Sequence, residues 1–120
     1  MTEKGTLPFG VEFEGQTHRE FELRPQYVRD TVDIFEDPAA GKRAEKNNQY
    51  FAACLFAGRL VRLGDIPKEA ITVDMLLDMH QDDYEAIIKA GKRLEEQEAT
   101  FRRQTATVAT KGAGPAEGGV

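Results

Sequence analysis

Cysteine, tryptophan and long apolar runs are scarce in this sequence, and these absences narrow the class of protein. Cys54 is the single cysteine and there is no tryptophan. One cysteine cannot form an internal disulfide, and an unpaired thiol is typical of a reducing compartment. No stretch approaches the roughly 18 apolar residues of a membrane-spanning helix, and residues 1–8 lack the basic start and apolar core of a signal peptide. We therefore expect a cytoplasmic protein without a membrane partner.

Basic residues are too few to favour a nucleic-acid partner. Sixteen Lys and Arg against 21 Asp and Glu leave a formal charge of -5, and affinity for a phosphate backbone depends largely on cationic side chains. The glycines do not form either of the common phosphate-binding loops, G-x-G-x-x-G and G-x-x-x-x-G-K-S/T. The 120 residues, 40% hydrophobic and 31% charged, are typical of one ordinary globular domain without a nucleotide cofactor.

Apolar periodicity predicts an α+β fold. Apolar residues alternate with polar ones on both sides of a turn at residues 14–17, which predicts a β-hairpin over residues 9–24. Helical spacing then predicts three or four helices against which the hairpin packs. We place these helices at residues 26–36, 43–63, 72–80 and 82–104. The second of them is the most apolar and is expected to be the central core element.

Turn and capping residues set the expected boundaries. Asp37-Pro38 is expected to end the first helix, residues 39–42 to form a loop, and Gly64 to end the second helix. Thr72 is a suitable N-cap for the third helix. The sequence from Thr105 onward consists almost entirely of Thr, Ala, Gly and Val, so we expect a flexible N-terminus at residues 1–6, one domain at 7–104 and a flexible tail at 105–120.

One cluster has the residue types of a metal or acid-base site. It consists of Asp78, His80, Asp82 and Asp83, and carboxylates with an imidazole are ligands for divalent cations. The cluster spans the junction between two predicted helices and has no fixed ligand spacing. Its aspartates are explained instead as caps and as anions at the start of the last helix, with Asp82 or Asp83 as the cap. We expect no metal there.

The remaining reactive side chains do not form a catalytic pair. His18 follows the hairpin turn among charged residues, which predicts a surface position. Cys54 lies inside a predicted helix, and small buried thiols are usually inert. The sequence therefore predicts no catalytic residue.

A helix-turn-helix arrangement is the DNA-binding alternative. It would pair the helices at 43–63 and 72–80 across residues 64–71, a connection longer than the usual three or four residues. The second helix would have to enter a groove, yet it carries Asp74 and Asp78, which phosphates repel. The pattern therefore disfavours a DNA-binding regulator, which stays as an alternative hypothesis.

The order of several short motifs resembles that of a known family, the tail assembly chaperones of long-tailed bacteriophages, particularly the Mu-like group. The resemblance covers residues 7–104 and depends on the order and spacing of the motifs in a small acidic protein. The motifs are Leu23-Arg24-Pro25 at the end of the hairpin, Asp30 in the next helix, Asn47-Asn48-x-Tyr50, Arg59-Leu60-Val61-Arg62-Leu63-Gly64, Ile71-Thr72-Val73-x-Met75-Leu76, and Asp82-Asp83 at the start of the last helix.

The resemblance implies a non-enzymatic protein without a cofactor. Such chaperones bind the long, aggregation-prone tape-measure protein and promote assembly of the tail tube around it. The expected partners are the tape-measure protein, the tail tube protein and a further copy of the chain, in the cytoplasm of a bacterial host. The protein is expected to be absent from the finished virion, and a longer form made by ribosomal frameshifting would diverge in the tail from Thr105.

Apolar side chains on the predicted helices are the candidates for partner binding. A holder of amphipathic helices needs an apolar groove with an acidic exterior, and methionine side chains adapt to varied apolar partners. The residues assigned to this face are Tyr50, Leu55, Met75, Met79 and Phe101. The alternatives to the chaperone are a small structural or adaptor protein of the phage particle, the DNA-binding regulator, and an enzyme that uses a metal in the Asp/His cluster.

Overall fold

A computed structural model describes the backbone of residues 1–113 and the side chains of residues 1–106, and it confirms the α+β fold. The strands form one antiparallel sheet in the order β1-β2-β3. Its strands are β1 (Glu3–Phe13), β2 (Gln16–Leu23) and β3 (Leu60–Leu63). The helices are α1 (Val28–Glu36), α2 (Pro38–Lys46), α3 (Asn48–Arg59), the single-turn η1 (Lys68–Ala70), α4 (Val73–Leu77) and α5 (Gln81–Ala113).

The predicted hairpin is present, with a two-residue turn at its tip. Glu14 and Gly15 both have positive φ, 50° and 80°, the backbone conformation that the tightest hairpin turns require. The register then shifts between Thr6 and Val11, so β1 carries a bulge. The strand starts at Glu3, and residues 3–6, predicted to be flexible, pair with β2.

The prediction of one long central helix at residues 43–63 is wrong, because a capping residue, Asn47, and the strand β3 divide the segment. The Asp37 side chain accepts hydrogen bonds from the backbone N–H groups of residues 39 and 40, so residues 39–42 belong to α2 instead of a loop. Asn47 caps α3 in the same way. Beyond Arg59 the chain becomes extended, and β3 pairs with β2, which places Leu60 and Leu63 in the core.

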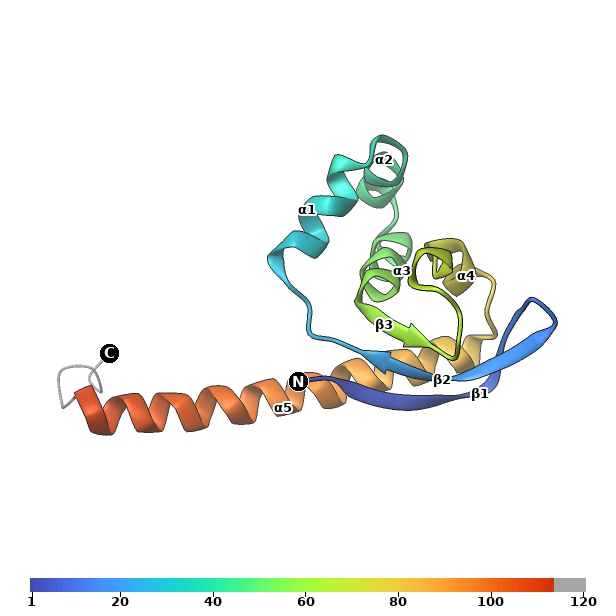
Figure 1. Ribbon diagram of the computed structural model, residues 1–120. Helices are drawn as coiled ribbons and strands as arrows, with labels where there is room; N and C mark the ends of the chain where they lie inside the picture. Colours follow the sequence, from blue (N-terminus) through green and yellow to red (C-terminus); the bar gives the residue numbers. More distant parts are fainter. Residues whose placement is uncertain (114–120) are drawn as a thin grey trace.

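The main core lies between the sheet and the helices. It is formed by Leu7, Phe21, Leu23, Ala57, Leu60, Leu63, Ile66, Ile71, Leu76, Ile87 and Ala90. Helix α5 lies alongside the hairpin, and helices α1 to α4 gather on one side of the molecule (Figure 1). A smaller cluster of Ile34, Ala44 and Tyr50 joins α1, α2 and α3. The sheet and the helices thus bury apolar residues between them, whereas Val28, Val32 and Phe35, the apolar stripe of α1, stay exposed.

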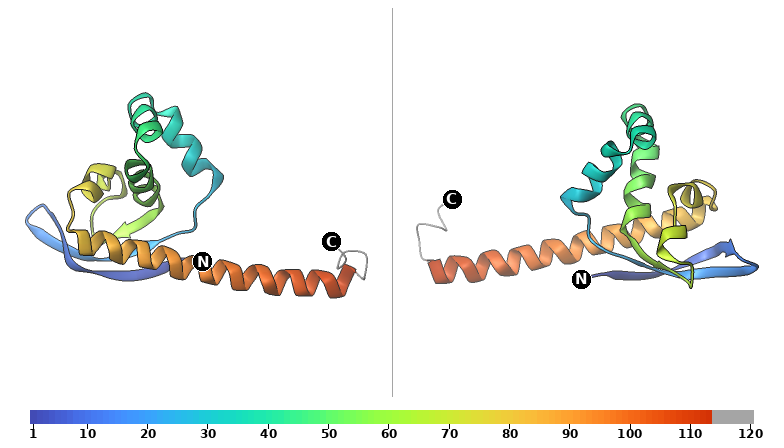
Figure 2. Two further views of the ribbon diagram at one scale, coloured as in Figure 1. Left: turned by 180° about the vertical axis from the view of Figure 1, so that it is seen from behind. Right: turned by 45° about the horizontal axis from the view of Figure 1, so that its top comes forward.

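Helix α5 is longer than predicted and extends past the rest of the molecule. Its 33 residues correspond to roughly 50 Å of helix, and both views in Figure 2 show its second half standing clear of the other elements. Residues 105–113, predicted as part of a flexible tail, are helical; the rest of that prediction, residues 114–120, lies outside the described residues. The Glu3 carboxylate accepts hydrogen bonds from Arg93 and Gln97, both at 2.6 Å, which fastens the start of β1 to α5.

Within the part of the chain that the structure describes, no helix combines the length and the apolar content needed to cross a bilayer.

Candidate functional site

The fold directs Asp83 away from the other members of the Asp/His cluster. Asp83 is fully buried, and its two carboxylate oxygens accept hydrogen bonds from the backbone N–H groups of Phe9 (2.8 Å) and Gly10 (3.0 Å) in the β1 bulge. His80 stacks on the Phe9 ring at a centroid distance of 4.0 Å. Among the described residues, no three His, Cys, Asp or Glu side chains gather where they could hold a metal ion.

The cap of α5 is also different from the predicted one. The Nδ1 atom of His80 accepts a hydrogen bond from the backbone N–H of Asp82 at 3.0 Å, so the imidazole caps the helix in place of an aspartate. Asp82 is 60% exposed, and Asp83 is directed into the bulge of β1. The expectation that Asp82 or Asp83 caps the helix is therefore wrong, because β1 takes up the Asp83 carboxylate.

His18 is buried, in contrast to the predicted surface position. Its Nδ1 atom accepts a hydrogen bond from the backbone N–H of Asp65 at 3.2 Å, and its ring lies edge-on to Phe13 at 6.5 Å. The buried residues of β2 are His18, Phe21 and Leu23, so the inward-facing positions change from even to odd residue numbers next to the register shift. Simple alternation of inward and outward residues does not predict this change, which is why His18 was expected at the surface.

Cys54 is half-buried on α3 beside the smaller cluster. Burial raises the pKa of its thiol, although the Tyr50 hydroxyl and Arg43 act in the opposite direction. A raised pKa leaves less of the nucleophilic thiolate at neutral pH. The geometry gives Cys54 the character of a packing residue.

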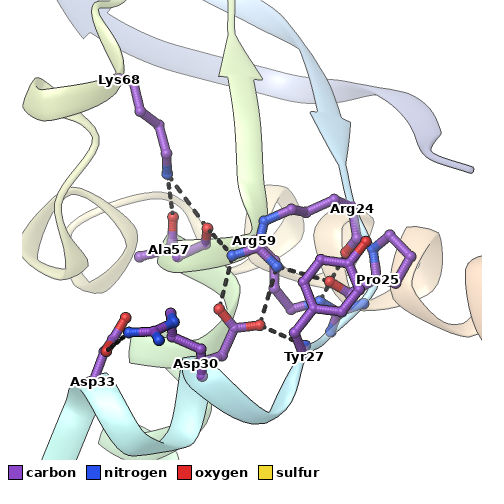
Figure 3. Close-up of polar contacts among 10 residues, drawn as sticks. Arg24, Pro25, Tyr27, Asp30, Asp33, Ala57, Arg59 and Lys68 are labelled. Atoms are coloured by element: carbon purple, nitrogen blue, oxygen red, sulfur yellow. Dashed lines mark hydrogen bonds and ion pairs between the residues drawn. The ribbon is translucent and has the colours of Figure 1, made fainter.

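The densest set of polar contacts connects α1 to the end of α3 (Figure 3). Arg24 makes two hydrogen bonds to Asp30, at 2.7 and 3.0 Å, and a third to the Gly58 carbonyl at 3.0 Å. The backbone N–H of Tyr27 donates to the same Asp30 carboxylate at 2.7 Å. The Arg24 hydrogen bond lowers the pKa of Asp30, and the same bond raises the pKa of Arg24. This cluster holds α1 in place.

Two further cations complete this polar region (Figure 3). Arg59 is buried, and its Nε atom donates to the Arg24 carbonyl at 3.0 Å. The ammonium of Lys68 donates to the carbonyls of Ala57 (3.2 Å) and Gly58 (3.4 Å) at the end of α3. Burial lowers the pKa of Arg59 and of Lys68. These donors satisfy backbone carbonyls, so the region is structural.

The five residues predicted as a partner-binding face do not form one exposed surface. Tyr50 is buried under the Arg43 guanidinium, which lies 4.2 Å from its ring centroid, and Leu55 packs against the same small cluster. Met75 and Met79 pack against the main core. Phe101 is 59% exposed, but it lies 22 residues beyond Met79, mostly along one continuous helix. The five side chains therefore lie in different places, and their role in partner binding stays a prediction.

An apolar groove lies between α3, α4 and α5, with a volume of about 600 Å³. Its lining residues are Gln49, Ala52, Ala53, Phe56, Leu76, Leu77, Met79, Gln81, Tyr84 and Ile88. Ala53 and Leu76 are buried and form its floor, whereas Leu77 is 41% exposed at its edge. Of the five predicted residues, Met79 is the one that lines this groove.

Small residues make room for the groove and for its aromatic wall. Ala52 and Ala53 have small side chains, which leave space for the groove above the backbone of α3. Phe56 packs edge-on against Tyr84 at a centroid distance of 5.9 Å and forms the aromatic wall. A Cβ atom at Gly91 would lie 3.2 Å from the Phe56 ring, so glycine lets α5 approach this wall. Burial raises the pKa of Tyr84, so its hydroxyl stays neutral. The consecutive alanines were the sequence signal for the groove, but they are equally compatible with a buried helix.

Acidic residues flank the groove-lining residues in the sequence of α4 and the start of α5, although the described lining itself contains no Asp or Glu. Residues 73–88, which include α4 and the first turns of α5, contain five acidic residues and no Lys or Arg. Asp83 is the buried one, and the exposed ones are Asp74, Asp78, Asp82 and Glu85. Glu85 accepts a hydrogen bond from the groove residue Gln81 at 3.4 Å. The groove therefore has an apolar floor, and the four exposed acidic residues adjacent in sequence to its lining residues are called its acidic border.

A second apolar surface lies on α1. Val28, Val32 and Phe35 are spaced four and three residues apart, which places them on one face of the helix, and all three are exposed, Val28 at 84%. Phe35 also contacts the Phe51 ring at a centroid distance of 5.7 Å. An amphipathic helix that turns part of its apolar stripe to solvent indicates an interaction surface.

No family model, curated protein or solved structure matches the chain. The features of the chain that bear on function are the groove, its acidic border and the exposed apolar residues.

Proposed function

We propose that the protein is a tail assembly chaperone of a Mu-like phage or prophage, which binds the tape-measure protein and promotes assembly of the tail tube. The observation that carries the proposal is the apolar groove between α3, α4 and α5. Its dimensions and apolar floor suit one face of an amphipathic helix. The motif order described above supplies the identity of the client.

The groove offers the binding energy that a holder needs. Full burial of one Leu, Ile, Phe or Met side chain contributes roughly 1.5–3 kcal/mol, so a few apolar residues of a client helix give useful affinity. Met79 adds a flexible thioether that adapts to different side chains. A groove of this kind recognises the helical spacing of apolar residues in its client instead of one fixed sequence. A long helical client offers many such segments.

The charge of the protein suits the same role. The formal charge of -5 makes complexes of the protein with an apolar client negatively charged. Repulsion between these complexes opposes aggregation. The exposed stripe of α1 supplies a second apolar contact on the same chain. Both features support a protein that keeps an insoluble partner in solution.

The DNA-binding alternative has less support. Helix α4, which would have to enter the groove of a duplex, has five residues and carries Asp74 in its first turn. The adjoining start of α5 is acidic as well, and phosphates repel such a surface. The structural or adaptor alternative uses the same apolar surfaces, and it differs in predicting that the protein remains in finished virions. Mass spectrometry of purified particles separates the two, since a chaperone is absent from them.

Co-expression with the tape-measure protein tests the proposal. Leu77 and Val61 are equally exposed, at 41%, but Leu77 borders the groove and Val61 lies on β3. We expect the wild type and Val61→Gln to keep the tape-measure protein soluble, and Leu77→Gln to lower its soluble yield. Ala52→Trp, which fills the groove, should lower the yield further.

Two results would contradict the proposal. The first is a tape-measure protein that is equally insoluble with and without the wild type, which rejects the chaperone function. The second is an equal effect of Leu77→Gln and Val61→Gln, which rejects the groove as the client site. Circular dichroism of each purified variant checks that the fold is intact.

A further inference from the structure

The end of α5 extends beyond the other described elements of its own chain (Figure 1 and Figure 2). We call residues 100–113 of α5 the arm. Every arm side chain that the structure describes, residues 100–106, is exposed, including Phe101 at 59%. A free helix of this length is marginal in water, even in alanine-rich sequences. The arm therefore has the character of a helix that a partner stabilises.

The arm and the acidic border of the groove carry opposite charges. The arm contains Arg102, Arg103 and Lys111 and no acidic residue, whereas residues 73–88, which supply much of the groove lining, carry four exposed acidic residues and no Lys or Arg. Opposite charges on two surfaces speed their encounter and fix their relative orientation. Phe101, beside the two arginines, supplies the apolar residue that the groove floor requires.

The arm cannot reach the groove of its own chain. Gln81, Tyr84 and Ile88 line the groove from the start of α5, and Phe101 lies 13 residues further along the same unbroken helix, at a distance of roughly 20 Å. A continuous helix does not fold back on itself, and Figure 1 shows the arm leading away from α3 and α4. Any groove that the arm fills must belong to another molecule.

We propose that the arm of one molecule docks into the groove between α3, α4 and α5 of a second copy. Phe101 enters the groove beside Leu77 and Met79, and the guanidinium groups of Arg102 and Arg103 face the acidic border. Because the two contacting surfaces differ, the association is head-to-tail, and it continues into longer chains or closes into a ring. This inference does not depend on the chaperone function. If that function is also correct, arm and client compete for one groove.

A mixing experiment with two variants of the full chain tests the direction of this contact. The arm variant carries Phe101→Ser, Arg102→Glu and Arg103→Glu and keeps its groove intact. The groove variant carries Ala52→Trp and keeps its arm intact. In sedimentation velocity, we expect the wild type to form larger species as its concentration rises and each variant alone to remain monomeric. An equimolar mixture of the two should form a heterodimer that does not grow further.

Controls separate loss of docking from loss of folding. Arg29→Glu reverses an exposed charge on α1, with a side chain that is 81% exposed, and it should leave self-association unchanged. Raising the salt concentration should weaken association of the wild type, since the contact joins opposite charges. If Ala52→Trp fails the circular dichroism check, Leu77→Gln replaces it as the groove variant.

Three results would overturn the inference. A wild type that stays monomeric at every concentration shows that the arm does not dock. Undiminished assembly of the arm variant places the interface elsewhere, for example on the apolar stripe of α1. Failure of the mixture to form a heterodimer, when each variant is folded and monomeric, shows that an intact arm does not dock into the intact groove of another molecule.

Discussion

Replacing Asp83 tests how the start of α5 is fixed to the sheet. Its carboxylate is fully buried and accepts two backbone hydrogen bonds from the β1 bulge, at 2.8 and 3.0 Å. Asp83→Ala removes both bonds and leaves two part-buried N–H groups without this acceptor. A hydrogen bond to a charged group contributes about 1.5–3 kcal/mol, and an orphaned donor costs a similar amount. We therefore expect Asp83→Ala to lower the free energy of unfolding by about 3–5 kcal/mol.

A loss of that size is measurable by urea denaturation, because domains are stable by only about 5–15 kcal/mol. Asp83→Asn keeps one acceptor but turns an amide NH₂ group toward the second N–H, so its loss should be about 2–4 kcal/mol. Asp82→Ala is the matched control. This neighbour is 60% exposed and should cost less than about 1 kcal/mol. Hydrogen exchange should also become faster at the amides of Phe9 and Gly10.

Equal losses for Asp83→Ala and Asp82→Ala would refute the reasoning. So would unchanged hydrogen exchange at Phe9 and Gly10 in Asp83→Ala, since the bonds would then not exist in solution.

Three further predictions concern residues outside the groove. Asp30→Asn should lower the free energy of unfolding by about 1–2 kcal/mol at neutral pH, as measured by urea denaturation. The fold lowers the pKa of Asp30, so its carboxylate stabilises the wild type only while it is ionised. The difference between the two proteins should therefore disappear as the pH falls below the unfolded-state pKa of about 3.9 and through the folded value. Gly64→Ala should destabilise more than Gly15→Ala in the same assay, since both glycines have positive φ but a Cβ atom meets the His18 ring only at position 64. Cys54 should react with iodoacetamide more slowly in the folded protein than in urea, because burial raises the pKa of its thiol.

Local signals in the sequence were sufficient for the hairpin, for α1 and for α4. Alternation of apolar residues around Glu14-Gly15 marks the hairpin, and the Thr72 hydroxyl accepts a hydrogen bond from the backbone N–H of Met75, as its predicted role as an N-cap requires. These features depend on neighbours within a few residues, which periodicity and capping rules describe.

Tertiary contacts decided the elements that the sequence did not predict. Residues 43–63 keep a helical spacing of apolar side chains, which masks the local cap at Asn47, and Leu60 pairs with β2. His18 accepts a hydrogen bond from Asp65, and Asp83 accepts one from the bulge in β1. The positions of Leu60, His18 and Asp83 thus depend on residues that are distant in sequence.

The groove could be inferred only in part for the same reason. Met79 was a candidate because flexible apolar side chains suit adaptable binding. Its other walls come from α3 and α5, and small alanines at 52 and 53 have the same composition whether they lie under a groove or inside a core. The helical conformation of residues 105–113 was not predicted, because a Thr- and Ala-rich segment with glycines is more typical of a flexible tail than of a helix.

Methionine methyl NMR tests the central claim most directly, because the chain has three methionines in different settings. Met79 lines the groove, Met75 packs against the core, and Met1 lies at the start of the chain. The protein, labelled with ¹³C at the methionine methyl groups, is titrated with a purified helical segment of the tape-measure protein. We predict that the Met79 signal shifts most strongly while the Met1 signal stays unchanged. A bound segment that leaves Met79 unshifted would contradict the assignment of the groove as the client site.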